Sequence, residues 1–164
     1  DVRQRIDQER NEERFERIFG YIESHAESEQ MIFFDGQVYD AFELLADIVG
    51  RAEREIVLVD GYVDLGTLNI LKKKREGVSV TVWTKRKGDK LSDADVETFR
   101  AQYGPFEFKH TEAFHDRFLI LDGKVGYHVG ASLKDAGKKC FGISLMQDDA
   151  MVRAVLERLE LQTS

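Results

Sequence analysis

The chain has 164 residues, of which 42% are hydrophobic, and a formal net charge of −7. This composition excludes a disordered chain, and the length suits one domain with an appended segment. No apolar run approaches the roughly 20 residues of a membrane helix, and no signal peptide is visible. The single cysteine, Cys140, cannot form an internal disulfide, which favours a cytoplasmic protein. An acidic balance is also unusual for a nucleic-acid-binding protein.

Residues 2–28 have the pattern of a charged helix. Phe15, Ile18, Phe19 and Ile22 recur at helical spacing, so we expect the second half of this helix to pack against another surface. The first half has little to bury. It is either a linker helix from a missing upstream domain or part of a dimer contact. We therefore divide the chain into a helical extension over 1–30 and a domain over 31–164.

Strand and helix patterns alternate after residue 30. Several segments have helical periodicity, and two of them begin at residues that favour the N-cap position, Asp64 and Ser92. Asp95 lies three residues after Ser92, as in an acidic variant of the capping box. We expect strands at 31–34, 55–60, 78–83, 106–109, 115–121, 125–129 and 140–146, and helices at 38–52, 64–75, 92–103 and 149–161. This alternation predicts an α/β fold with right-handed crossovers. The late hairpin over 115–129 makes the expected sheet mixed, mostly parallel, and flanked by helices.

The segment 114–132, FHDRFLILDGKVGYHVGAS, contains the most informative residues. Side chains alternate along a strand, so His115 and Arg117 share one face at its start. Arginine recognises phosphate through a planar fork, and histidine acts as nucleophile or proton shuttle near neutral pH. Asp122, in the following turn, orients a neighbour or caps the turn. On spacing alone, a His and an Arg at a strand end are more often surface residues than a catalytic pair.

The arrangement His115-x-Arg117-x4-Asp122, followed by Gly130-Ala131-Ser132, resembles the signature of the phospholipase D superfamily. That signature is His-x-Lys-x4-Asp and then a Gly-Ser-x-Asn turn. The resemblance covers roughly residues 31–161. More narrowly, the stretches VYDAF, VDGYVD, FHDRFLILD and YHVGASLKDAGKK resemble C-terminal domains of bacterial proteins whose N-terminal domains are phage-type DNA-binding modules.

The resemblance implies a mixed sheet flanked by helices and phosphodiester cleavage that needs no metal or other cofactor. It implies that His115 forms a phosphohistidine and that a second histidine protonates the leaving group. Because this chain has one motif, the resemblance also implies a homodimer in which two copies of His115 meet. Arg117 replaces the family lysine, and the family serine and asparagine fall near Ala131 and Leu133. Asp148 or Asp149 is the nearest candidate for the late carboxylate that orients the histidine.

Several residues are candidates for binding phosphate or substrate. The turn Gly130, Ala131 and Ser132 offers backbone N–H groups to an anion, and Ser132 alternatively caps the turn. Three basic clusters, residues 72–75, residues 85–87, and Lys134 with Lys138 and Lys139, are either solvated surface or local anion sites. Lys134 and Lys138 are candidates for holding a nucleic-acid backbone.

Tyr62 lies with Asp60 and Asp64 just past a buried strand, where open α/β sheets often bind ligands. A capped turn is the simpler explanation of that segment. The histidines and Cys140 lack metal-ligand spacing.

Two main hypotheses follow. The first is a homodimeric phosphodiesterase or nuclease with His115, Arg117 and Asp122 as catalytic residues. The second is a catalytically impaired module that dimerises and binds nucleic acid or an effector in a prophage or defence-type protein. A third hypothesis is a toxin or defence effector that acts on nucleic acid or lipid headgroups. The sequence does not distinguish it from the first hypothesis. The absence of a basic amphipathic helix argues against a membrane partner.

Overall fold

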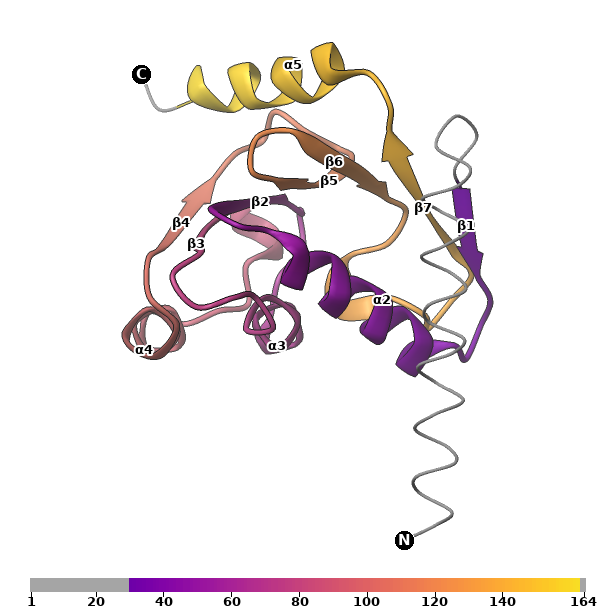
Figure 1. Ribbon diagram of the computed structural model, residues 1–164. Helices are drawn as coiled ribbons and strands as arrows, with labels where there is room; N and C mark the ends of the chain where they lie inside the picture. The colour runs from indigo at the N-terminus through magenta and orange to yellow at the C-terminus, as the bar shows by residue number, and fades with distance from the viewer. Residues whose placement is uncertain (1–29, 163–164) are drawn as a thin grey trace, which may run out of the picture.

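The computed structural model describes residues 30–162, so the expected helix over 2–28 lies outside the described residues. Strands and helices alternate along the described part of the chain (Figure 1). The strands are β1 (Gln30–Phe33), β2 (Glu55–Val59), β3 (Ser79–Thr84), β4 (Phe106–His110), β5 (Arg117–Leu121), β6 (Val125–Val129) and β7 (Phe141–Met146). The helices are α2 (Val38–Arg51), α3 (Leu65–Leu71), α4 (Asp93–Tyr103) and α5 (Asp149–Glu160), with short 3-10 turns η1 (Arg86–Gly88) and η2 (Leu133–Asp135).

The seven strands form one sheet in the order β1-β7-β6-β5-β2-β3-β4. The pairs β2–β3 and β3–β4 are parallel, whereas β2–β5, β5–β6, β6–β7 and β1–β7 are antiparallel. The α/β class and the mixed sheet are therefore confirmed. The expectation of a mostly parallel sheet is wrong, because the hairpin β5–β6 inserts beside β2 and extends an antiparallel half through β7 to β1.

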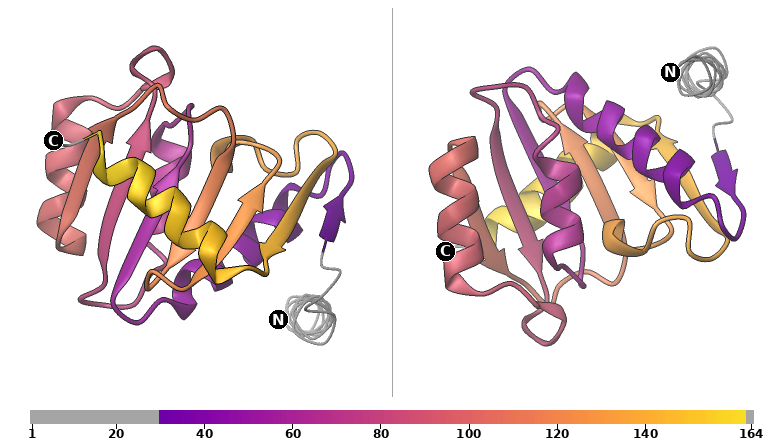
Figure 2. Two further views of the ribbon diagram at one scale, coloured as in Figure 1. Left: turned by 90° about the horizontal axis from the view of Figure 1, so that it is seen from above. Right: turned by 90° about the horizontal axis from the view of Figure 1, so that it is seen from below.

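Helices cover both faces of the sheet. The helices α2, α3 and α4 lie on one face, and α5 crosses the other (Figures 1 and 2). The larger core lies under the three helices and includes Leu45, Leu58 and Leu119. A smaller core lies under α5 and includes Trp83, Ile120 and Val152. Successive residues of β5 thus serve opposite cores, which is the alternation expected of a strand buried on both faces.

The predicted helix caps are present. Asp64 accepts a hydrogen bond from the Gly66 N–H at 2.7 Å, and Ser92 forms a reciprocal capping box with Asp95. The helix α3 ends at Leu71, four residues before the predicted end. Its last turn tightens because the Lys73 and Lys74 N–H groups bond to carbonyls only three residues back. The chain then turns back early enough to enter β3.

The strand directions bring several chain segments to one end of the sheet. The parallel strands β2, β3 and β4 end there. The strand β6 ends there too, because β5 is antiparallel to both β2 and β6, so β6 runs in the same direction as β2. The strand β5 begins at the same end, since it runs antiparallel to β2 and β6. The functional candidates after β2, before β5 and after β6 therefore meet at this end, which we call the site end.

Candidate active site

Arg117 is the first residue of β5 and lies at the site end. In the sheet it stands opposite Val129 of β6, and the next residue, Phe118, stands opposite Val59 of β2. Its Nε donates a hydrogen bond to Ser132 Oγ at 3.2 Å and lies 3.7 Å from Asp60 Oδ1. Within residues 30–162 its Nη atoms make no hydrogen bond. The guanidinium is therefore held on one side and has donors left for an anion.

Asp60 anchors this end of the sheet. It follows β2 directly, and its side chain is 0% exposed. Its carboxylate accepts hydrogen bonds from Ser132 Oγ at 2.8 Å, the Leu133 N–H at 2.9 Å and the Tyr62 N–H at 3.1 Å. Burial raises the pKa of Asp60, and these hydrogen bonds together with the Arg117 charge oppose the rise without cancelling it. One carboxylate thus ties the ends of β2 and β6 to Arg117.

His115 lies in the bend that precedes β5, and its side chain is exposed. The predicted strand over 115–121 begins only at Arg117, so strand alternation does not fix the direction of His115. Within residues 30–162 the imidazole has no hydrogen bond or ion pair. It is therefore accessible to a substrate, two residues from the anchored arginine.

The turn after β6 is built differently from the prediction. The Gly130 N–H donates to the Gly142 carbonyl at 2.7 Å, so it is not available to an anion. A Cβ at Gly130 would stand 2.9 Å from that same oxygen, which explains the glycine. Ser132 is buried at 4% exposure and is occupied by Asp60 and Arg117. Leu133 is a core residue at 2% exposure that contributes only its backbone N–H.

Asp122 lies at the other end of β5, away from the site end. Its carboxylate accepts hydrogen bonds from the backbone N–H groups of Glu53, Arg54 and Glu55, at 2.7 Å for Arg54. Burial acts to raise its pKa, but these donors and the Arg54 charge outweigh it and lower the pKa of Asp122. The catalytic role predicted for Asp122 does not fit this position. Its contacts are those of a structural clamp between β5 and the start of β2.

Comparisons with solved structures show which known fold the chain has. No family model and no curated protein matches the chain in sequence. Among solved structures, NucT from Helicobacter pylori has a TM-score of 0.60 at 9% identity and covers 80% of this chain and 93% of its own. Nuc from Salmonella typhimurium, a phospholipase D family member, has a TM-score of 0.56 at 16% identity and covers 80% of this chain and 91% of its own.

The chain has the phospholipase D fold. A third similar structure is TrmBL2, an archaeal chromatin protein described as having a novel mode of DNA binding. It has a TM-score of 0.52 at 15% identity and covers 98% of this chain, which spans 64% of TrmBL2. The fold predicted from the segment 114–132 is therefore confirmed.

The late carboxylate predicted for the phospholipase D-like site is not where the resemblance placed it. Asp148 N-caps α5 and accepts a hydrogen bond from the Ala150 N–H at 2.8 Å. It follows β7, a strand that begins at the site end and finishes at the opposite one, so Asp148 and Asp149 lie at the end of the sheet away from His115 of the same chain. Asp60 is the buried acid at the site end. Its position after an apolar run was the available signal, but a capped turn was the simpler interpretation.

The two lysines predicted to bind a nucleic-acid backbone, Lys134 and Lys138, are paired with an acidic residue. Lys134 pairs with Asp135 at 2.8 Å, and Lys138 pairs with the same carboxylate at 3.3 Å. The side-chain hydrogen bond to Asp135 is the main reason why the pKa of Lys134 is raised. Ala131 is half-buried in the turn. Tyr62 is 49% exposed and is held through its backbone by Asp60, so it remains a candidate for substrate contact.

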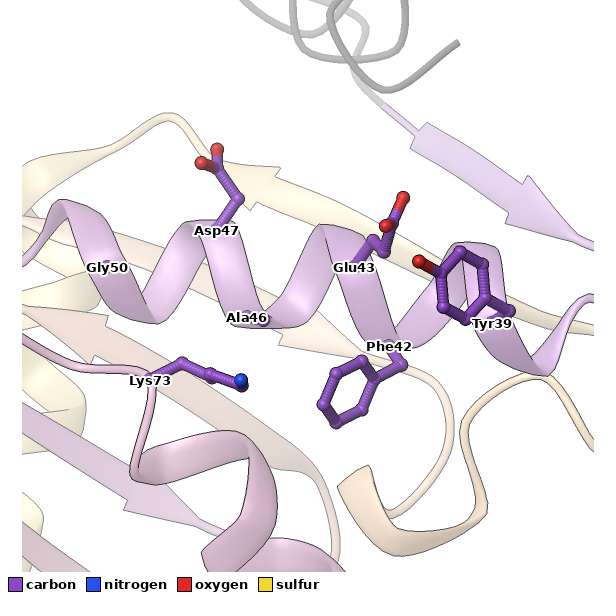
Figure 3. Close-up of a pocket in the computed structure, with 7 residues that line it drawn as sticks. All are labelled: Tyr39, Phe42, Glu43, Ala46, Asp47, Gly50 and Lys73. Carbon is purple, nitrogen blue, oxygen red and sulfur yellow. The ribbon is translucent and has the colours of Figure 1, made fainter. Parts of the chain in front are cut away.

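Other features of the surface do not add to this site. In the described range, no group of three or more His, Cys, Asp or Glu side chains is arranged to hold a metal. No helix in that range is long and apolar enough to cross a membrane. A hollow of about 530 Å³ lies along α2 beside the turn after α3, and its lining includes Phe42, Asp47 and Lys73 (Figure 3). It is lined by residues of α2 and of the turn after α3, and by none of the residues around Asp60.

Proposed function

We propose that this chain is a metal-independent phosphodiesterase that cleaves nucleic acid, as a homodimer in which two copies of His115 share one site. The observation that carries the proposal is the anchored Arg117, with exposed His115 two residues before it at the end of a phospholipase D fold. The similarity to Nuc and NucT supports the nuclease class. The exposed, unpaired Cys140 fits a reducing, cytoplasmic location.

The proposed chemistry uses the two histidines in turn. His115 attacks phosphorus and forms an N–P bond while the bond from phosphorus to the leaving oxygen breaks. That oxygen takes a proton from the partner subunit's His115. Water then attacks phosphorus, gives its proton to the same partner histidine, and breaks the N–P bond. The sum converts a phosphodiester and water into a phosphomonoester and an alcohol, and needs one neutral and one protonated imidazole.

Arg117 has the role of stabilising charge on the phosphoryl oxygens. Two oxygens gain negative charge as the nucleophile approaches, and a fixed guanidinium opposes that charge without reorganising. Asp60 and Ser132 hold the Nε side of Arg117, which leaves the Nη side for phosphate. This arrangement supplies a reason for arginine instead of lysine. A single ammonium cannot bond Ser132 and bind phosphate with a separate planar edge.

A second candidate function is a module that dimerises and binds nucleic acid or an effector with impaired catalysis. It is favoured by Leu133, whose side chain lies in the core where the family pattern has a polar asparagine. It is also favoured by Asp60, which neutralises part of the Arg117 charge. This alternative predicts salt-dependent binding without turnover.

The test is hydrolysis of bis(p-nitrophenyl) phosphate and of labelled oligonucleotides in the presence of EDTA. His115→Ala should lower kcat by about 1,000-fold or more, because it removes the nucleophile. His128→Ala is the matched control, since His128 is a 43%-exposed histidine on the neighbouring strand β6. It should keep activity within about twofold. Sedimentation velocity should show a dimer.

Two results would contradict the assignment. Turnover that persists in His115→Ala excludes it as the nucleophile. A wild-type protein that binds nucleic acid and cleaves none of these substrates selects the binding module instead.

A bell-shaped dependence of kcat/KM on pH is expected, because the two histidines act in opposite protonation states.

A further inference from the structure

The basic cluster over residues 85–87 is not used by the site described above. It follows β3 directly, and therefore lies at the site end, beside the segment that follows β2. Two backbone hydrogen bonds join the segments, from the Val63 N–H to the Gly88 carbonyl and from the Lys90 N–H to the Val63 carbonyl, both at 3.0 Å. The cluster is thus part of a fixed loop over residues 85–90, which we call the basic loop.

The basic loop packs tightly on Tyr62. A Cβ at Gly88 would stand 1.8 Å from the Gly61 carbonyl oxygen and 2.8 Å from Cδ1 of Tyr62. Only glycine fits there, so the Tyr62 ring borders the loop backbone. The side chain of Lys85 lies along Gly61, within 3.3 Å of the Cβ position there. The aromatic ring and the basic loop therefore have a defined relative position.

The exposed cations of the basic loop have no acidic partner in the part of the chain that the structure describes. Arg86, Lys87 and Lys90 are exposed and have no ion pair within residues 30–162, unlike Lys134 and Lys138. The one acidic residue of the loop, Asp89, is occupied by His110 Nε2 at 3.0 Å and by the Leu91 N–H at 2.9 Å. The basic loop is therefore a local positive surface in a chain whose net charge is −7.

Tyr62 connects the basic loop to the candidate active site. Its N–H donates to Asp60 Oδ1 at 3.1 Å, and Arg117 Nε lies 3.7 Å from the same oxygen. The side chain of Tyr62 is nevertheless 49% exposed. An exposed aromatic ring beside a basic loop, on a segment whose backbone bonds the same carboxylate as Arg117, is the combination that binds unpaired bases and their phosphates. The ring stacks on a base, and the cations hold the backbone.

We propose that Tyr62 and the basic loop form a binding track for single-stranded nucleic acid that leads to Arg117. Tyr62 stacks on an unpaired base, and Arg86 and Lys87 bind the adjacent phosphates. The track favours single strands because base faces in a duplex are covered by their neighbours, whereas an unpaired base presents a face to the ring. This inference rests on the proposed function and assigns its substrate class.

The test is fluorescence anisotropy with labelled single-stranded DNA, single-stranded RNA and a DNA duplex of matched length. Either single strand should bind at least about tenfold more tightly than the duplex at equal salt. Tyr62→Ala should weaken single-strand binding by about 5- to 150-fold, the value of one base stack, and Tyr62→Phe should retain most of it. Arg86→Ala/Lys87→Ala should reduce the slope of log K against log salt by about 1.4, or 0.7 for each lost phosphate contact.

A matched control is available at the opposite end of the sheet. Lys72 and Lys73 follow α3 and are exposed, so Lys72→Ala/Lys73→Ala removes the same charge away from the proposed track. This variant should bind within about twofold of the wild-type protein. If it weakens single-strand binding as much as Arg86→Ala/Lys87→Ala does, the loss of affinity comes from the change in net charge, and the proposed track is wrong. Equal affinity for single strands and duplex, or wild-type affinity in Tyr62→Ala, also overturns the track.

Failure of the track and failure of the proposed function give different results. Anisotropy needs no turnover, so a protein that binds single strands through Tyr62 without cleaving them contradicts the hydrolytic function and supports the track. A protein that hydrolyses bis(p-nitrophenyl) phosphate through His115 but binds single strands and duplex equally contradicts the track alone.

Discussion

The two ends of β5 use charged residues in opposite ways. At its start, Arg117 is half-buried against a fully buried Asp60, and its Nη side makes no hydrogen bond within the described residues. At its end, Asp122 is enclosed by backbone N–H donors from the segment before β2. The pKa of Asp60 is raised by burial, whereas that of Asp122 is lowered because its hydrogen bonds outweigh burial. The first end retains binding capacity for a ligand, and the second uses its capacity for the fold.

The largest expected effect on stability is at Asp60. Asp60→Ala leaves the buried Ser132 hydroxyl and the Leu133 N–H without their acceptor, and removes the countercharge of Arg117. We expect the free energy of unfolding to fall by about 3–5 kcal/mol, measured by urea denaturation. Asp64→Ala, four residues along, removes only the cap of α3 and should cost about 1 kcal/mol. Equal losses in the two variants would show that Asp60 is no more than a turn residue.

A smaller loss is expected at the other end of β5. Asp122→Ala removes the common acceptor of three backbone N–H groups, which water partly replaces because the site is near the surface. The free energy of unfolding should fall by about 1–3 kcal/mol. Asp116→Ala is the control, because within residues 30–162 that exposed acid makes one ion-pair contact, 3.5 Å from His128 Nε2. It should change stability by less than about 0.5 kcal/mol. An unchanged free energy of unfolding in Asp122→Ala would show that Asp122 does not clamp β5 to the start of β2.

The smallest effect is the pH dependence of stability. The lowered pKa of Asp122 stabilises the folded chain above the ordinary aspartate pKa of about 3.9, and this contribution is lost as pH falls through the folded value. The raised pKa of Asp60 has the opposite sign, because the folded state holds that proton more tightly. Asp122→Asn should therefore lose less stability than the wild-type protein between about pH 5 and pH 3, measured by denaturant titration at each pH. A steeper acid loss in Asp122→Asn would contradict the sign.

Much of the fold follows from local patterns in the sequence. The elements, the caps at Asp64 and Ser92, and the mixed sheet are local consequences of periodicity and side-chain hydrogen bonding. The strand order was not local, since the insertion of β5 beside β2 depends on packing between distant segments. This is why the share of antiparallel pairing was underestimated.

The site was only partly predictable for the same reason. Arg117 was found from its chemistry, but its partner Ser132 lies 15 residues on, and Asp60 lies 72 residues before Ser132. Only the sheet register brings these three together. The distance of Asp122 from Arg117 was not evident from the motif, because a motif states spacing along the chain only. Asp122 lies five positions after Arg117, or roughly 16 Å along an extended strand. Ser132 was expected to face a ligand, and it is instead the buried link between Asp60 and Arg117.

The division of roles along β5 is tested most directly by kcat/KM for bis(p-nitrophenyl) phosphate, with EDTA present, in Arg117→Ala and Asp122→Ala side by side. The assay is run at a temperature where thermal unfolding shows both variants folded. We expect a loss of about 100-fold or more in Arg117→Ala, from removal of transition-state charge stabilisation, and a change within about twofold in Asp122→Ala. A folded Asp122→Ala protein that loses as much activity as Arg117→Ala, or an Arg117→Ala protein with wild-type activity, would contradict this division of roles.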